Sequence, residues 1–167
     1  MTKTNDNLQA AFAGESQANR KYLAFAQQAD KDGLPQIARL FRAAAEAETV
    51  HAHNHLRVMG GIKSTVENLK AAIEGEQHEF TKMYPEFLND SKEEGHKQAE
   101  RSFDLANQVE KIHHELYKKA LKAAEEGKDL EKKDIHICPV CGYTHEGKLP
   151  VKCPVCGVPK EKFKKID

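Results

Sequence analysis

Two Glu-x-x-His pairs, each preceded by a further glutamate, are the residues best suited to chemistry. They are Glu15, Glu48 and His51 in the first half of the chain, and Glu76, Glu110 and His113 in the second. A separation of three residues keeps the Glu and the His of each pair on one face of a helix. The two sets recur with nearly equal separations, which we interpret as an internal repeat.

Each of the four glutamates lies about midway along an apolar helical stripe. The stripe of residues 35–58, for example, runs through Ile37, Phe41, Ala44, Glu48, His51, His55 and Val58. An isolated ionised carboxylate in an apolar interior costs several kcal/mol or more. A protonated or salt-bridged core glutamate explains one such residue equally well. Four of them, with no Lys or Arg at the same level of the stripes, indicate a site for multivalent metal.

The ligand set also indicates which metal is bound. One Glu from each of two helices, with Glu-x-x-His from each of two others, is the arrangement of di-iron and di-manganese carboxylate bundles. Carboxylate oxygens with two imidazoles suit iron or manganese better than structural zinc. Glu79 lies one turn beyond Glu76 on the flank of the same stripe. Its spacing fits a further ligand and a solvated surface residue equally well.

The cysteines form a second candidate site. They occur as two CPVCG repeats near the C-terminal end: Cys138 and Cys141, then Cys153 and Cys156. Each repeat is suited to a tight knuckle, and two such pairs are typical of one tetrahedral site with four thiolate ligands. The spacing does not separate zinc from iron. Zinc would be structural, whereas iron would make the segment a one-electron carrier.

Four helices must position the carboxylates. We expect them at about residues 5–31, from Pro35 to the MGG segment, from the capping box Ser64-x-x-Glu67 to about residue 94, and at about residues 96–126. Pro85 should kink the third helix. The predicted domains are a helical bundle at 1–127, a charged linker at 128–135 and a small cysteine module at 136–167.

Composition limits the classes of function. Charged residues make up 31% and apolar residues 39%, and the formal net charge is zero. No general attraction to nucleic acid or membrane is therefore expected, and no apolar run is long enough to cross a membrane. The first residues lack the features of a signal peptide, which favours the cytoplasm. In that compartment, paired CxxC motifs favour metal over disulfides.

The whole chain resembles the rubrerythrin family. The segments that carry the resemblance are AFAGESQANRKYLAFA, AEAETVHAHNHL, IEGEQHEFTKMYPEF, VEKIHHELY and the two CPVCG repeats. It implies an all-α ferritin-like four-helix bundle followed by a small rubredoxin-like metal ribbon. It also implies two non-haem iron ions held by Glu15, Glu48, His51, Glu76, Glu79, Glu110 and His113, and one iron held by the four cysteines.

Further roles follow only from this resemblance. Glu48 and Glu110 would bridge the two irons, and Glu79 would exchange with His51 as the redox state changes. Tyr22 and Tyr84 match family tyrosines that hydrogen-bond to the site. The activity implied is reduction of hydrogen peroxide to water in defence against oxidative stress.

The implied partners are an electron donor and other copies of the chain. A separate rubredoxin or NAD(P)H-dependent reductase would supply electrons, because no G-x-G-x-x-G motif follows a strand in this sequence. A homodimer or a larger assembly is expected. An extended linker would otherwise have to lie along its own bundle, so we expect each cysteine module to meet the di-iron site of another chain.

Two other functions compete with the peroxidase. A ferroxidase or iron-storage protein would use oxygen, although the bulky tail argues against a closed ferritin-like shell. A non-enzymatic module would bind zinc in the ribbon and a partner on the helices, although the seven-ligand set argues against it.

Overall fold

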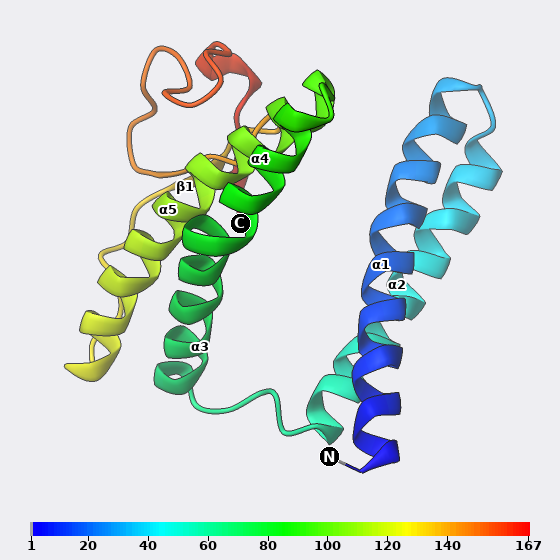
Figure 1. Ribbon diagram of the computed structural model, residues 1–167, viewed down its shortest axis with the longest axis horizontal. Helices are drawn as coiled ribbons and strands as arrows, with labels where there is room; N and C mark the ends of the chain where they lie inside the picture. The colour runs from blue at the N-terminus through cyan, green and yellow to red at the C-terminus, as the bar shows by residue number, and fades with distance from the viewer. Residues whose placement is uncertain (1) are drawn as a thin grey trace. The chain divides into compact units, whose positions relative to one another are not determined.

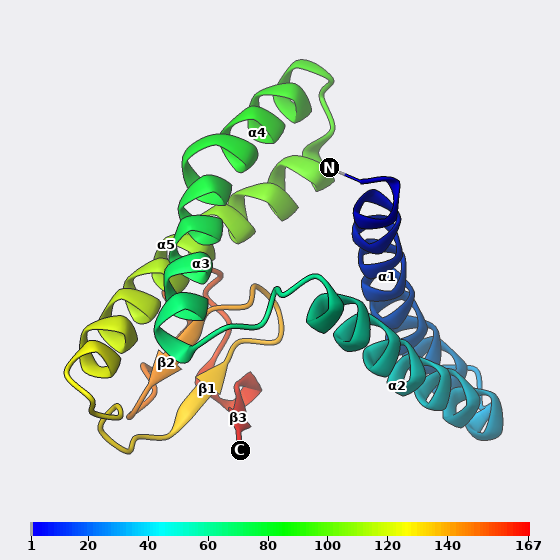
Figure 2. The same cartoon turned by 90° about the horizontal axis from the view of Figure 1, so that it is seen from below.

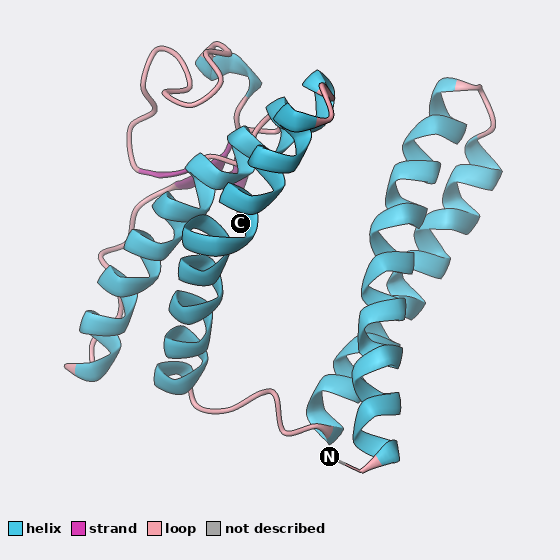
Figure 3. Ribbon diagram, in the orientation of Figure 1, coloured by secondary structure: helices cyan, strands magenta, loops and turns pink. Residues whose placement is uncertain are grey.

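The computed structural model describes residues 2–167 and forms two compact units, residues 1–63 and 64–167, each described here by itself (Figure 1). The first unit holds α1 (Lys3–Lys31) and α2 (Pro35–Val58). The second holds α3 (Thr65–His78), α4 (Tyr84–Glu93) and α5 (Lys97–Glu125), followed by β1 (Ile135–Ile137), β2 (Thr144–Glu146) and β3 (Lys164–Ile166). Among residues 2–167, strands occur only in this C-terminal part (Figure 3).

The first unit is an antiparallel helical hairpin whose seam is made of small side chains. Ala26, Ala29 and Ala38 are almost fully buried, and Phe41 packs against them. Small residues let the two helix backbones approach closely and leave little side-chain entropy to lose. The turn between the helices uses Gly33 at φ 74°, and Pro35 begins α2 with the φ angle that a first helical turn requires. The helix bounds expected from the sequence are confirmed to within two residues.

The capping box expected at the start of α3 is present. The Ser64 hydroxyl accepts a hydrogen bond from the backbone N–H of Glu67, and the Glu67 carboxylate accepts one from the backbone N–H of Ser64. Both bonds satisfy amide groups that the first turn of a helix leaves without partners.

The region around Pro85 differs from a simple proline kink. Residues Glu79–Met83 form one π-helical segment between α3 and α4, and Pro85 then lies in the first turn of α4. The backbone N–H of Tyr84 donates to the carbonyl of Glu79, five residues earlier. Proline cannot donate and clashes with the carbonyl four residues earlier, so a wider turn accommodates it at low cost. The π-helical segment begins at Glu79, the residue that the sequence placed one turn beyond Glu76.

The C-terminal module is a three-stranded antiparallel sheet in the order β2-β1-β3. Two matching turns carry the cysteines. In the first, the N–H of Gly142 donates to the Cys138 carbonyl at 2.9 Å; in the second, the N–H of Gly157 donates to the Cys153 carbonyl at 2.9 Å. Both glycines have positive φ, 85° and 78°, a conformation that favours glycine. The two knuckles expected from the CPVCG repeats are therefore present.

The module packs on α5 of its own chain through β2, which is labelled beneath this helix in Figure 2. Gly127, at φ 69°, ends α5 and reverses the chain direction. The stretch 127–134 then runs back without regular structure. Extended, it spans about 25 Å, enough to cover the roughly 18 Å of helix between Glu125 and His113. The linker therefore lies along its own helix, an arrangement that the sequence interpretation considered unfavourable. The expectation that each cysteine module meets the di-iron site of another chain stays a prediction.

Candidate metal centres

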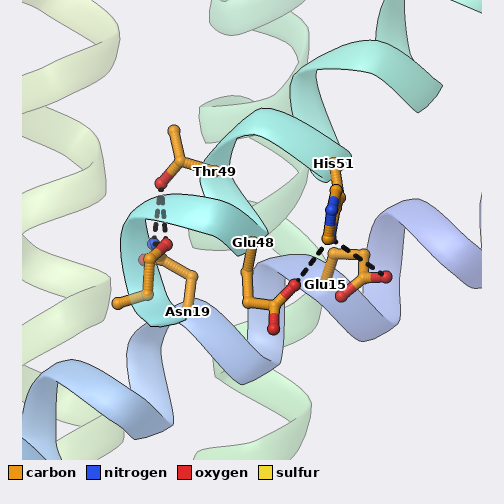
Figure 4. A network of polar contacts seen from close by, with 6 residues as sticks. Glu15, Asn19, Glu48, Thr49 and His51 are labelled. Atoms are coloured by element: carbon orange, nitrogen blue, oxygen red, sulfur yellow. Dashed lines mark hydrogen bonds and ion pairs between the residues drawn. The ribbon is translucent and has the colours of Figure 1, made fainter. Parts of the chain in front are cut away.

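The first unit brings three of the predicted ligands together. Glu15 of α1 and Glu48 and His51 of α2 place one ligand atom each within 4.8 Å of one another. The Nδ1 atom of His51 lies 2.8 Å from Oε2 of Glu48 and 4.0 Å from Oε1 of Glu15. Figure 4 shows the three side chains pointing toward one another from the two helices.

A polar contact beside this cluster fixes how α1 meets α2. The side-chain amide of Asn19 donates to the Ala45 carbonyl at 2.7 Å and to the Thr49 hydroxyl at 2.8 Å (Figure 4). Asn19 lies one turn after Glu15, and Thr49 directly follows Glu48. This pair of hydrogen bonds therefore sets the rotation of both helices at the level of the carboxylates. The sequence interpretation missed Asn19, because a helical Asn carries no pattern that distinguishes it from a surface residue.

The second unit repeats the arrangement. Glu76 of α3 and Glu110 and His113 of α5 form the equivalent group, with ligand atoms within 4.8 Å of one another. The Nδ1 atom of His113 lies 2.8 Å from Oε2 of Glu110 and 3.8 Å from Oε1 of Glu76. The side chains of Glu76 and Glu110 are 17% and 16% exposed. In both halves of the repeat, the histidine therefore presents the same nitrogen to two carboxylates.

Burial and mutual repulsion perturb the acids of the second cluster. The pKa of Glu76 rises to about 7, because the group is desolvated and its hydrogen bond and charge interactions with Glu110 favour the protonated form. Desolvation and the charge of Glu110 also raise the pKa of Glu79, partly offset by His78 and His113. Carboxylates crowded in this way repel one another when they are ionised. A divalent metal bound between them would offset that repulsion.

Glu79 is not part of the compact group of three in the second unit. It lies at the first residue of the π-helical segment, near enough to Glu110 for their charges to interact. π-Helical turns of this kind are frequent at functional sites. Its role as a ligand stays a prediction.

The two predicted tyrosines lie in aromatic clusters. Tyr22 packs against Phe25 and Phe41 in the first unit, with ring centroids 6.3 and 6.2 Å away. Tyr84 packs against Phe87 and Phe103 in the second. Desolvation and then the charges of Glu79, Glu110 and Glu76 raise the pKa of Tyr84. Its phenol therefore stays protonated and able to donate a hydrogen bond near neutral pH.

Tyr117 and Thr144 were not singled out from the sequence as site residues. The pKa of Tyr117 is raised by desolvation and by the charges of Glu76 and Glu110, which places its phenol near the second cluster. The hydroxyl oxygen of Thr144, on β2, lies 3.0 Å from Nε2 of His113. Nothing in the sequence marks Thr144, because the contact joins residues 31 positions apart.

The four cysteines form a third group that fits a tetrahedral metal. The sulfur atoms of Cys138 and Cys156 are 3.5 Å apart, and those of Cys141 and Cys153 are 3.6 Å apart. Metal–sulfur bonds of about 2.3 Å in a tetrahedron place sulfurs about 3.8 Å apart. The cysteines are free of disulfides.

The cysteine backbone also favours thiolates at one position. Burial raises the pKa of Cys138, but hydrogen bonds from the N–H groups of Val140 and Cys141 and from the neighbouring thiols of Cys156 and Cys141 lower it, so the net pKa is lowered. Burial raises the pKa of Cys141 and Cys156. Crowded thiols of this kind ionise together only when a cation binds them, which fits the ligand spacing of a metal site.

Comparison with known proteins decides the family. The family description "Rubrerythrin" matches residues 6–121, and "Rubrerythrin, rubredoxin-like domain" matches residues 136–164. The chain belongs to the rubrerythrin family. These matches, with the helices and the sheet of clustered cysteines, confirm the fold class: a four-helix bundle followed by a rubredoxin-like ribbon.

Individual relatives cover nearly the full length. The chain is 39% identical to Rubrerythrin-2 of Clostridium acetobutylicum, over 96% of this chain and 95% of the relative. It is 35% identical to rubrerythrin of Nitratidesulfovibrio vulgaris, over 97% and 93%. Among solved structures, "Fully reduced state of nigerythrin (all ferrous)" has 35% identity and a TM-score of 0.60, covering 99% of this chain and 88% of that one. Among the residues described, no helix has the length and apolarity needed to span a membrane.

Proposed function

We propose that this protein is a non-haem di-iron peroxidase that reduces hydrogen peroxide to water, with electrons delivered through the four-cysteine iron site. One observation carries the proposal: the ribbon that holds the cysteines is hydrogen-bonded, through Thr144, to His113 of a carboxylate–histidine cluster. A zinc ribbon with a purely structural role has no need to contact such a cluster.

The two clusters would supply the ligands of the di-iron site. Glu15, Glu48 and His51 come from one unit and Glu76, Glu110 and His113 from the other, with Glu79 as the additional, redox-dependent ligand. The donor set fits iron, because it combines carboxylate oxygens with two imidazoles. Relatives support the choice of metal, since a nigerythrin structure is described as all ferrous. Iron held by these residues would supply the two electrons that cleavage of an O–O bond requires and the positive charge that offsets the charge developing on the oxygens.

The protein's own residues would bind peroxide and manage protons. Tyr84 keeps its proton because its pKa is raised, so it can donate a hydrogen bond to an oxygen that gains negative charge. Tyr22 would serve the other half of the repeat. Reduction of peroxide to two waters also consumes two protons and two electrons.

The cysteine site would hold iron as a one-electron carrier, because zinc has no redox chemistry. A separate rubredoxin or an NAD(P)H-dependent reductase would reduce it. We further propose a cytoplasmic protein that forms at least a homodimer, and the domain division 1–127, 128–135 and 136–167.

The experiment compares peroxide with oxygen as oxidant. Fully reduced, iron-loaded protein is mixed anaerobically with hydrogen peroxide or with oxygenated buffer, and oxidation of the iron is followed by its absorbance. We expect peroxide to react much faster than oxygen and to be turned over repeatedly with a rubredoxin and its reductase. Faster reaction with oxygen, with ferric iron accumulating in the protein, would instead establish the ferroxidase alternative.

A further inference from the structure

The ribbon contacts the second carboxylate–histidine cluster through one hydroxyl group. Thr144 on β2 places its oxygen 3.0 Å from Nε2 of His113, and the same oxygen lies 3.3 Å from the carbonyl of Gly142. A hydroxyl has one hydrogen to donate and two lone pairs that accept. Thr144 can therefore donate to the Gly142 carbonyl while it accepts a hydrogen bond from the His113 ring.

The contact is supported on both sides by packing and charge. Gly142 lies against Val109 of α5. A Cβ atom added at this glycine would be 3.7 Å from Cγ1 of Val109, an ordinary van der Waals contact. Val109 itself is only 2% exposed. One helical turn and a half beyond His113, Lys119 forms an ion pair with Glu146 of β2. Three contacts along α5, made by Gly142, Thr144 and Glu146, therefore hold β2 against the helix at the level of the His113 ring.

The other nitrogen of the same ring faces the acids. Nδ1 of His113 lies 2.8 Å from Glu110 and 3.8 Å from Glu76. A neutral imidazole carries one proton, and the nitrogen without it is the one that binds metal. A proton held on Nε2 by an acceptor thus leaves the lone pair of Nδ1 directed at the carboxylate cluster.

We propose that Thr144 is a positioning residue for metal binding. Its hydroxyl accepts the hydrogen bond from Nε2–H of His113, fixes the tautomer and ring orientation in which Nδ1 is the ligand, and passes its own hydrogen to the Gly142 carbonyl. The proposal rests on His113 being a metal ligand. It makes the ribbon part of the carboxylate–histidine site of its own chain. Because Gly142 directly follows Cys141, covalent bonds and these two hydrogen bonds also form a continuous path between the cysteine site and the His113 ring.

The repeat provides an internal comparison. His51 presents Nδ1 to Glu48 at the same distance, 2.8 Å, but its helix belongs to the unit that carries no ribbon. Loss of the Thr144 hydroxyl should therefore affect His113 and leave His51 unchanged. An effect confined to one of two similar histidines distinguishes positioning from a general loss of stability.

The test measures metal binding and the proton position, without turnover. Thr144→Val keeps the shape of the side chain and removes the hydroxyl, Thr144→Ser restores a hydroxyl, and Thr65→Val is the same substitution at an exposed first-turn position of the same unit. Titration with Co²⁺ should show about 10-fold weaker binding at the carboxylate–histidine site in Thr144→Val. Thr144→Ser and Thr65→Val should bind like wild type. The Co²⁺–thiolate absorption of the ribbon reports in each variant whether that site is intact.

A second measurement uses the unaltered protein. In Zn²⁺-loaded wild type, ¹⁵N NMR should place the His113 proton on Nε2, with slow exchange of that proton. Wild-type Co²⁺ affinity in Thr144→Val with an intact ribbon overturns the proposal, and so does a His113 proton found on Nδ1. If Thr144→Val loses the ribbon site, the NMR result in wild type decides. Failure of wild type itself to bind Co²⁺ at the carboxylates would overturn the proposed metal centre instead.

Discussion

Glu76 should destabilise the fold when the carboxylate sites hold no metal. Its pKa in the folded protein is raised from 4.5 to about 7, first by desolvation and then by its interactions with Glu110 and Glu79. A carboxyl group with a raised pKa binds its proton more tightly in the folded state, so ionisation opposes folding. The penalty is complete above about pH 7, shrinks as the pH falls from 7 to 4.5, and is absent below 4.5.

The magnitude follows from the size of the rise. At 1.36 kcal/mol per pH unit, it corresponds to at most about 3.4 kcal/mol. Water still reaches this partly exposed cluster and screens its charges, so we expect roughly half, about 1–2 kcal/mol. Glu76→Gln mimics the protonated form and can still donate a hydrogen bond to Glu110. In metal-free protein at pH 8 it should therefore raise the free energy of unfolding by about 1–2 kcal/mol, or the midpoint temperature by roughly 3–8 °C.

The assay follows helix content by circular dichroism during urea unfolding at pH 8 and at pH 4.5. Glu74→Gln is the matched control, because Glu74 lies on the same helix but is exposed. It should change stability little at either pH. At pH 4.5 the advantage of Glu76→Gln should largely disappear, and with metal bound the sign should reverse because a ligand is lost. A variant that is less stable than wild type at pH 8 without metal, or equally shifted at both pH values, would refute the reasoning.

Four further outcomes are expected. Glu79→Ala should keep most of the iron but slow peroxide turnover well beyond any loss of metal; unchanged turnover at equal iron loading would remove Glu79 from the site. Metal analysis after growth with ample iron should give about three irons per chain, and oxidised protein should be red from ferric thiolate; a colourless protein with zinc in the ribbon would contradict the electron relay. Replacing Cys153 and Cys156 with Ser should remove one metal and abolish donor-linked turnover, while reduced protein still reacts once with peroxide; full donor-linked turnover would exclude the ribbon from the route. Co-refolding that double variant with Glu110→Ala should not restore donor-linked turnover, because the ribbon contacts α5 of its own chain; recovery of activity would show delivery between chains.

Features set by neighbouring residues could be read directly from the sequence. The helix periodicity, the Ser64 capping box and the CPVCG knuckles depend on interactions within a few positions, and all of them are present. The Glu-x-x-His pairs belong to the same class, because a separation of three residues already places Glu48 with His51 and Glu110 with His113. The positions of the glutamates on the apolar stripes likewise indicated that a metal ion must offset the charge of the buried carboxylates.

Features that depend on competing or distant interactions could not be read in this way. Pro85 indicated a disturbance, but the choice between a kink and a π-helical segment depends on how α3 and α4 continue to pack along α5. The return of the linker along its own α5 could not be read from the sequence, because length alone allows the linker either to return or to extend. In the folded chain the linker returns, and β2 and Gly142 then lie against α5.

The sequence by itself therefore determined which residues can bind metal, since ligand type and helical spacing are local properties. Only the tertiary structure decided how those residues are tuned. The raised pKa of Glu76 requires the desolvation and the neighbouring charges that folding assembles. The second hydrogen bond of His113 requires a strand 31 residues away in sequence. Both effects arise from groups brought within a few ångströms by the chain's long-range packing, which no local pattern encodes.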